Sequence, residues 1–231
     1  MKLSIVIPVY NEAGTVQDLV KAVIKSLDDL GYEKDIVIVD DFSSDGSREL
    51  LKKLEGKNGV SVYYHGYNQG KGAALRTGFA RVSGDIVIIQ DADREYDPRE
   101  YARLIEPILD GRAEVVYGSR FAGGATRAMF FWHMVGNKFL TLLSNMLTNL
   151  SLTDMETCYK VFRIEVVRKI RIRSHRFGVE PELTAKVARL GCRVYELPIS
   201  YSGRSYEEGK KTGWKDGLAA VWSIIRFAVS D

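Results

Sequence analysis

Short apolar runs recur along the first half of the chain, and longer segments between them place apolar residues at helical spacing. Near-continuous aliphatic runs of this kind are typical of strands in a sheet that is covered on both faces. The runs occupy residues 3–9, 35–40, 60–64 and 85–90, and helical patterns cover 13–30, 45–54 and 70–82. A further helix is predicted to begin at Asp97 and Pro98, a good N-cap followed by a proline suited to the first helical position. This alternation predicts an α/β fold with a mostly parallel, doubly wound sheet flanked by helices.

The second half of the chain has a different pattern. "EVVYGSRF" predicts another strand, "DMETCYKVFR" a return to the sheet, residues 179–190 a helix, and "RVYELPISY" a late strand. Between the first two lies a long amphipathic stretch, 128–152, which fits either a helix pair packed in the core or a surface that rests on a membrane. There is no internal repeat and no clean linker, so we expect one domain spanning 1–231.

No segment has the roughly 18 consecutive apolar residues that a membrane span requires. The stretch 128–152 comes nearest, but it is interrupted by His133, Gly136, Asn137, Lys138, Asn145 and Asn149. The N-terminal apolar run has no small-residue cleavage site after it and is interpreted as a strand, not a signal peptide. We therefore expect a cytoplasmic protein without a transmembrane segment, either free or bound peripherally to the cytoplasmic face of the membrane.

Composition and charge narrow the function classes. Apolar residues make up 45% and charged residues 27%, which is ordinary for a globular protein, and the net charge of +3 is too small to indicate general nucleic-acid binding. Cys158 and Cys192 stand outside any CxxC pattern, so neither a zinc site nor a disulfide framework is predicted, and both are expected to be reduced thiols in the core.

Polar side chains follow each predicted strand of the first half, and in a parallel sheet these strand ends meet at the edge where ligands bind. Three common phosphate-binding patterns do not fit: "PVYNEAGT" lacks GxGxxG, "GYNQGKG" lacks the P-loop spacing, and "DDFSSDG" is no DxDx[TV] phosphatase motif. The pair Asp91 and Asp93 remains, leaving a buried strand two residues apart. Carboxylates so placed are typical ligands of Mg²⁺ or Mn²⁺, which would manage phosphate charge.

Six motifs occur in order along the chain: "SIVIPVYNE", "VIVDDFSSDGS", "NQGKGAALRTGFARVSGD", "QDADREYDP", "VYGSRF" and "TDMETCYKVFR". Together they resemble the family 2 glycosyltransferases with the GT-A fold, and most closely the dolichyl-phosphate mannose synthase and polyprenyl-phosphate sugar transferase branch. The resemblance covers nearly the whole chain. It implies a Rossmann-like GT-A sheet in which 1–117 form the nucleotide-sugar-binding half and 118–231 the acceptor and lid half.

The resemblance also implies roles for single residues. Asp91 and Asp93 match acids that hold a divalent cation on the donor diphosphate, and Glu95 stands where relatives often have a glutamine that also reaches the metal. The nucleotide-sugar site is expected to include Asp91 together with Pro8, Tyr10, Glu12, Asp40, Lys71, Ala92, Arg120, Arg204 and Lys210, and the metal site Asp91, Asp93 and Glu95. Among these, Asp40 matches the acid that hydrogen-bonds the base.

Some of these residues also fit plainer interpretations. Pro8 and Tyr10 would equally end a strand, and Arg204 and Lys210 lie in a polar loop whose charges would be solvated or would form a lid. Asp154, in the "TD" pair, fits either a catalytic base or a structural acid.

The catalytic candidates are Asp93, Arg120 and Asp154. Negative charge grows on the leaving diphosphate during sugar transfer, and the metal, Arg120 and Lys210 are expected to stabilise it. A polyprenyl phosphate acceptor is already an anion and needs no general base, whereas a hydroxyl acceptor does. We thus expect an inverting transfer from a GDP- or UDP-sugar to dolichyl or undecaprenyl phosphate. The alternatives are a hydroxyl acceptor on a glycan or protein, and a nucleotide-sugar binding module without turnover.

Overall fold

The computed structural model describes residues 1–123, 125–128, 130–176, 178–204 and 214–229. The first half of the chain contains β1 (Lys2–Val9), α1 (Val16–Leu30), β2 (Glu33–Asp40), α2 (Ser47–Leu54), β3 (Val60–Tyr64), α3 (Lys71–Phe79) and β4 (Ile86–Ile89). The second half contains the 3-10 helix η1 (Pro98–Glu100), α4 (Tyr101–Leu109), β5 (Val115–Ser119), α5 (Phe131–Thr148), β6 (Lys160–Arg163), α6 (Ile164–Lys169), α7 (Val179–Arg189), β7 (Val194–Pro198) and α8 (Trp214–Val229). The element types predicted from the sequence are confirmed. The side chain of Asp97 accepts a hydrogen bond from the amide of Arg99 at 2.9 Å, as an N-cap should.

The seven strands form one sheet in the order β3-β2-β1-β4-β6-β5-β7. Neighbours run parallel except around β6, which is antiparallel to both β4 and β5. The mostly parallel sheet is therefore confirmed, with β6 as the exception. Because β6 begins at the edge where β4 ends, the residues just before it cross the carboxyl ends of the parallel strands. This reversal carries the segment 154–158 to the edge where ligands bind.

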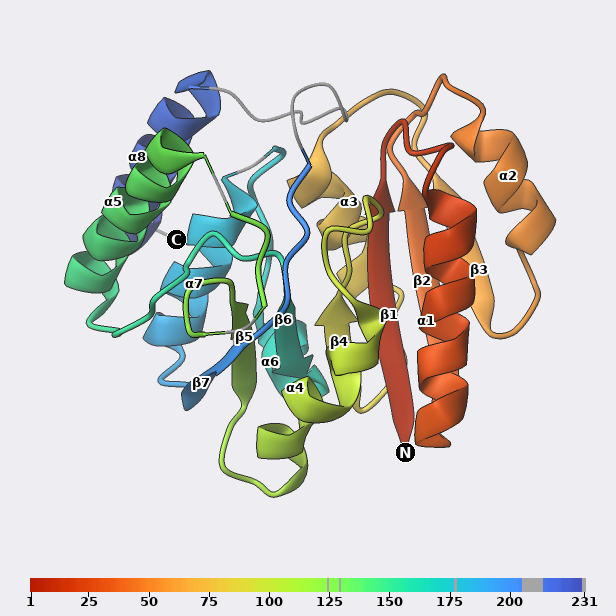
Figure 1. The fold of residues 1–231 in the computed structure, drawn as a ribbon, viewed down its shortest axis with the longest axis horizontal. Coiled ribbons are helices and arrows are strands. Elements are labelled where there is room, and N and C mark those ends of the chain that lie inside the picture. Colours follow the sequence, from red (N-terminus) through yellow and green to blue (C-terminus); the bar gives the residue numbers. More distant parts are fainter. Residues whose placement is uncertain (124, 129, 177, 205–213, 230–231) are drawn as a thin grey trace.

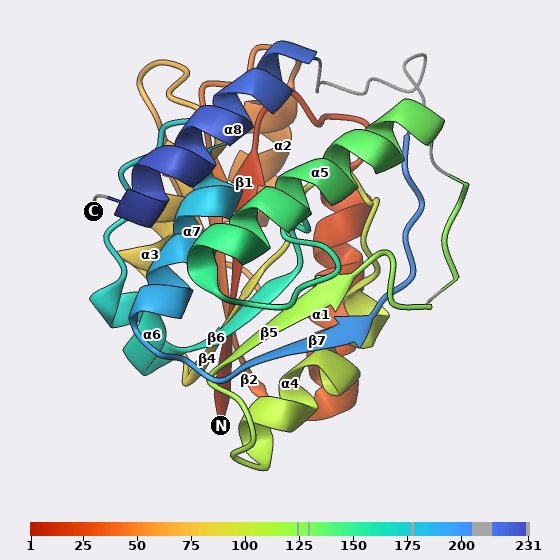
Figure 2. The same ribbon diagram turned by 90° about the vertical axis from the view of Figure 1, so that its left-hand side faces the viewer.

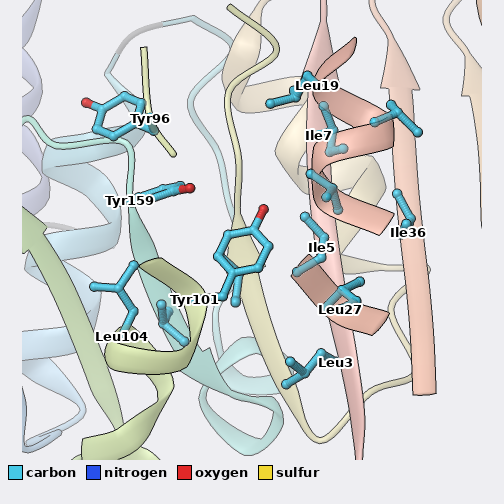
Figure 3. Packing of buried hydrophobic residues seen from close by; sticks show 14 of the residues in the cluster. Leu3, Ile5, Ile7, Leu19, Leu27, Ile36, Tyr96, Tyr101, Leu104 and Tyr159 are labelled. Carbon is cyan, nitrogen blue, oxygen red and sulfur yellow. The ribbon is translucent and has the colours of Figure 1, made fainter. Parts of the chain in front are cut away.

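Two apolar layers cover the sheet, and alternation along β1 supplies both of them. Ile5 and Ile7 pack against α1 and α4, where Figure 3 shows them beside Leu19 and close to Tyr101. Val6, between them, belongs to the layer on the opposite face under α3, α6 and α7. Every one of these side chains is buried, because successive residues of a strand point to opposite faces.

Helices α5 and α8 lie side by side on the outside of the second layer (Figures 1 and 2). The small polar residues Thr141 and Ser144 are the buried ones in α5, whereas many of its large apolar residues face outward: Phe131, Trp132, Val135, Phe139, Leu142, Met146 and Leu147. In α8 the same holds for Leu218, Trp222, Ile225 and Val229. The interpretation of 128–152 as a helix pair packed in the core is therefore wrong, because the apolar face of α5 is exposed.

Candidate active site

A cavity of about 1190 Å³ opens at the carboxyl ends of the parallel strands. Ten of the predicted site residues line it: Pro8, Tyr10, Glu12, Lys71, Asp91, Ala92, Asp93, Glu95, Arg120 and Arg204. Asp40 and Asp154 do not line it, and Lys210 lies outside the described residues. The fold thus brings most of the predicted site together from the strand ends and from the segment 201–204.

Asp91 follows β4 and is held in place by a buried polar network. Gln90 is fully buried; its side-chain amide donates to the carbonyl of Asp91 at 3.1 Å, and its Oε1 accepts from Tyr101 and Tyr159 at 2.7 and 2.6 Å. The Nζ atom of Lys71, at the start of α3, lies 2.8 Å from Asp91. Burial alone would lower the pKa of Lys71, but Asp91, Cys158 and Glu180 together outweigh it and keep the pKa well above its usual range. Lys71 therefore carries a positive charge that fixes the carboxylate of Asp91.

The surroundings of Asp93 disfavour the ionised form of its carboxyl group. Burial, with the negative charges of Asp91 and Glu95, raises the pKa of Asp93 to about 7, and the guanidinium of Arg204 offsets this only in part. That guanidinium lies 3.1 Å from Asp93 and 3.0 Å from Glu12. The crowded carboxylates therefore hold more negative charge than their protein partners neutralise.

Glu95 has different partners from those expected. Its Oε1 accepts from the backbone amide of Arg204 at 2.8 Å, and its Oε2 from the hydroxyl of Tyr201 at 2.7 Å. In this structure Glu95 thus ties the segment 201–204 to the strand end. Across the residues the structure describes, no group of three or more acidic, His or Cys side chains is arranged to hold a metal. The role of Glu95 as a third metal ligand stays a prediction.

The pair Asp91 and Asp93 nevertheless has the chemistry to bind a divalent cation. Mg²⁺ commonly takes only one or two carboxylates from a protein and completes its shell with substrate phosphates and water. The raised pKa of Asp93 indicates that this place lacks positive charge. Such a pair in a cavity that also contains Lys71 and Arg204 is suited to a metal-bound diphosphate.

Asp40, expected at the nucleotide base, is fully buried behind the cavity wall. The Nε atom of Arg48 donates to its Oδ2 at 2.6 Å, and the amide of Ser43 lies 3.3 Å from it. The adjacent Asp41 lines the cavity instead, and its carboxylate accepts from the Gly70 amide at 2.6 Å. The two neighbouring acids therefore have distinct places, which the string "VDD" did not distinguish.

Asp154, the candidate base, is fully buried and bound to Arg120. Both carboxylate oxygens accept from the guanidinium, at 2.6 and 2.7 Å, and the Arg120 amide adds a third bond at 3.0 Å. Both oxygens are therefore occupied by Arg120, and Asp154 does not line the cavity in which an acceptor hydroxyl would lie. The geometry favours the structural alternative, in which Asp154 orients Arg120 into the cavity.

One group of residues at the cavity wall was not predicted from the sequence. Lys71 also contacts Glu180, at 3.1 Å, and Glu180 accepts from the fully buried Lys160 at 2.6 Å. Glu156 and Cys158 line the same wall of the cavity, and Cys158 accepts a hydrogen bond from Lys71 at 2.9 Å. Both cysteines are free and partly buried against the apolar core, and Cys158 also lines the cavity. The only signal was the motif "TDMETCYKVFR", since α7, which supplies Glu180, gave no chemical pattern.

Comparison with known proteins identifies the family. The sequence profile of Glycosyl transferase family 2 matches residues 4–171, which include the strand ends and the acidic pair described above. The chain belongs to glycosyl transferase family 2. Its resemblance to this family, drawn from the six motifs, is thereby confirmed.

The curated relatives include transferases named for undecaprenyl phosphate or dolichol phosphate. An undecaprenyl-phosphate 4-deoxy-4-formamido-L-arabinose transferase of Edwardsiella ictaluri is 31% identical over 90% of this chain and 62% of its own length. An undecaprenyl-phosphate mannosyltransferase of Micrococcus luteus is 29% identical over 98% of both chains. A dolichol-phosphate mannosyltransferase of Pyrococcus furiosus is 30% identical over 92% of this chain and 60% of its own. The chain thus spans about three fifths of the length of two of these relatives.

A solved structure supports the fold. Glucosyl-3-phosphoglycerate synthase of Mycobacterium tuberculosis, in complex with Mn²⁺, UDP and phosphoglyceric acid, superposes with a TM-score of 0.76. The alignment covers all of this chain and 79% of that one at 19% identity. The GT-A expectation is confirmed. Among the described residues, no helix is both long and apolar enough to cross a membrane.

Proposed function

We propose that this chain is an inverting glycosyltransferase that moves a sugar from a nucleotide-sugar to a polyprenyl phosphate. The observation that carries the proposal is the continuity of one cavity, which is lined by Asp91 and Asp93 and also by Phe130 and Trp132 beside the exposed face of α5. A charged donor and a long apolar acceptor need such a cavity. The names of the relatives point to the same acceptor class.

The donor would bind at the acidic end, in the half formed by 1–117. Asp91 and Asp93 would hold Mg²⁺ or Mn²⁺, and the cation supplies positive charge to the leaving diphosphate when bound. Lys71 keeps the carboxylate of Asp91 in place. Arg204 is paired with Asp93 in this structure and would turn to the diphosphate once a cation takes over that carboxylate. Pro8, Tyr10, Glu12 and Ala92 form the wall beside these groups, and the role of Lys210 stays a prediction.

The acceptor would enter from the half formed by 118–231. An oxygen of the lipid phosphate attacks the anomeric carbon while the bond to the diphosphate breaks on the opposite side, which inverts the configuration. A phosphate is already ionised at neutral pH, so the step needs no general base. Arg120, held by Asp154, would bring positive charge to the phosphates that meet there.

The exposed face of α5 and α8 supports a membrane-bound acceptor. Trp132 is 78% exposed and Trp222 is 65% exposed, and monomeric proteins rarely leave contiguous apolar surface of this kind uncovered. Two adjacent helices with outward aromatic residues are suited to lie at the boundary between headgroups and acyl chains. The exposed basic residues between Arg168 and Arg176 would add attraction to an anionic leaflet, whereas Lys160 is buried. We accordingly assign the protein to the cytoplasmic face of the membrane as a peripheral protein.

A donor panel tests the proposal. Purified protein with Mn²⁺ or Mg²⁺ would be given UDP- and GDP-sugars together with undecaprenyl or dolichyl phosphate, and glycolipid would be detected by mass spectrometry. We expect transfer from one donor class, and we expect Asp93→Ala to lose donor binding and metal binding together. An exposed acid far from the cavity, Glu165→Gln, is the matched control. Absence of glycolipid with every donor would refute the acceptor assignment, and unchanged donor affinity in Asp93→Ala would refute the site.

A further inference from the structure

Glu156 is an acid of the cavity wall to which the proposed mechanism gives no role. It lies in the segment that crosses the strand ends before β6, and its side chain is partly buried. The Oε1 atom is shielded from solvent and has no hydrogen-bond partner in the part of the chain that the structure describes. Buried polar atoms without a partner are rare in native proteins and costly, so each of them calls for an explanation.

The neighbouring acids have cationic partners at short range. Asp91 has Lys71 at 2.8 Å, Asp93 has Arg204 at 3.1 Å, and Glu180 has Lys160 at 2.6 Å. Glu156 has no comparable ion pair among the described residues. Within the described part of the chain, Glu156 is thus an acid without a salt bridge among acids that have one, and it lines the cavity that a ligand would fill.

The position of Glu156 relates it to a definite part of the donor. The charges of Glu180 and Lys160, and those of Arg120 and Asp154, act on its carboxyl. Glu180 contacts Lys71, which contacts Asp91, so the first pair belongs to the diphosphate end. Arg120 belongs to the end where the acceptor phosphate would arrive. A nucleotide-sugar with its diphosphate at Asp91 and its anomeric carbon toward Arg120 would bring its sugar ring near Glu156, which lines the same cavity.

The chemistry of Glu156 suits a hydroxyl group. Burial, together with the negative charge of Glu180, raises the pKa of its carboxyl to about 7, so near neutral pH it carries a proton for part of the time. A carboxyl in this state both donates and accepts hydrogen bonds, as a sugar hydroxyl does. A phosphate only accepts at neutral pH, and the ionised form of Glu156 would repel it.

We propose that Glu156 hydrogen-bonds a hydroxyl of the donor sugar and thereby helps to select which sugar is transferred. The inference rests on the proposed function, because it takes the ligand of the cavity to be a nucleotide-sugar. A site that is built to bond a substrate hydroxyl discriminates strongly against an analogue without it, since the buried protein group is then left unpaired. Glu156 would therefore be a specificity-determining residue that acts on the sugar and not on the nucleotide.

Titration calorimetry with Mn²⁺ present separates the two parts of the donor. The probes are UDP, GDP, UDP-glucose and GDP-mannose, followed by monodeoxy forms of whichever sugar nucleotide binds. We expect Glu156→Ala to bind that sugar nucleotide about tenfold more weakly while its affinity for the nucleoside diphosphate stays within about twofold. Glu156→Gln should retain most of the affinity, because an amide also donates and accepts. Glu165→Gln is the control, and thermal unfolding verifies that each variant is folded.

A thermodynamic cycle that combines Glu156→Ala with deoxy donors tests the hydrogen bond to the sugar most directly. Removing the contacted hydroxyl should weaken binding to the natural protein but should cause no further loss in Glu156→Ala. Equal losses of diphosphate and sugar-nucleotide affinity in Glu156→Ala, or no loss of either, would overturn the inference while leaving the proposed function intact. It would also be overturned if Glu156→Gln bound the donor normally but lost turnover with hydroxyl acceptors, which is the behaviour of a general base. Failure of the natural protein to bind any UDP- or GDP-sugar would end both proposals.

Discussion

Replacing Glu156 by glutamine should make the protein more stable at alkaline pH. The pKa of Glu156 is raised to about 7 in the folded chain from an ordinary 4.5, chiefly by burial. The folded state keeps this proton up to about pH 7 while the unfolded chain releases it near pH 4.5, so the free energy of unfolding falls as pH rises between these values. At 1.36 kcal/mol per pKa unit the loss approaches about 3 kcal/mol, an upper figure because the side chain is partly exposed to the cavity. Glutamine does not titrate and avoids this loss.

Urea unfolding followed by tryptophan fluorescence at pH 5, 6, 7 and 8 measures the effect. Metal is removed by a chelator in every sample, so that the titration of Asp93 contributes equally to both proteins and cancels in their difference. We expect Glu156→Gln and the natural protein to differ least at pH 5 and to diverge as the pH rises to about 7, with the variant the more stable at pH 7 and 8. Glu165→Gln, changed at an exposed position, should show no such divergence. A difference that does not change with pH would refute the argument.

Two further substitutions test the framework of the site. Gly72→Ala would place a Cβ 2.3 Å from the carbonyl oxygen of Ser174, so we expect thermal unfolding to show a loss of about 1–3 kcal/mol, whereas Gly66→Ala, with open space around it, should change little. Asp154→Asn would leave the guanidinium of Arg120 without its buried counter-charge, and urea unfolding should show a loss of about 3 kcal/mol. An unchanged unfolding midpoint combined with lost turnover would instead make Asp154 a base.

Much of the architecture follows from local pattern. The strands of the first half show as apolar runs, and the helices between them as apolar residues at helical spacing. Because parallel strands end at one edge, the polar residues behind them had to gather there, as Asp91, Asp93 and Lys71 do. For the same reason the presence of a site at that edge was predictable without any structure.

The partners of individual charges were decided by long-range packing. The antiparallel direction of β6 brings Glu156 and Cys158 to the cavity wall, and α7 adds Glu180 from a segment without a recognisable motif. An acid pairs with whichever cation the fold brings within a few ångströms, so the sequence alone predicted neither the bonds of Asp154 to Arg120 nor those of Glu95 to Tyr201 and Arg204.

The long amphipathic segment 128–152 was likewise predictable only in part from the sequence. Its apolar residues were evident from the sequence, but whether they face the core or the outside depends on what the remaining chain provides as a covering layer. The small residues Thr141 and Ser144 face inward in α5 because α7 and α8 pack closely there, and Trp132 is left outside. Periodicity along the chain determined the helices, the strands and the edge where the site forms. Only the tertiary structure decided which charges are neutralised and which apolar face stays exposed, because both depend on neighbours that are distant in sequence.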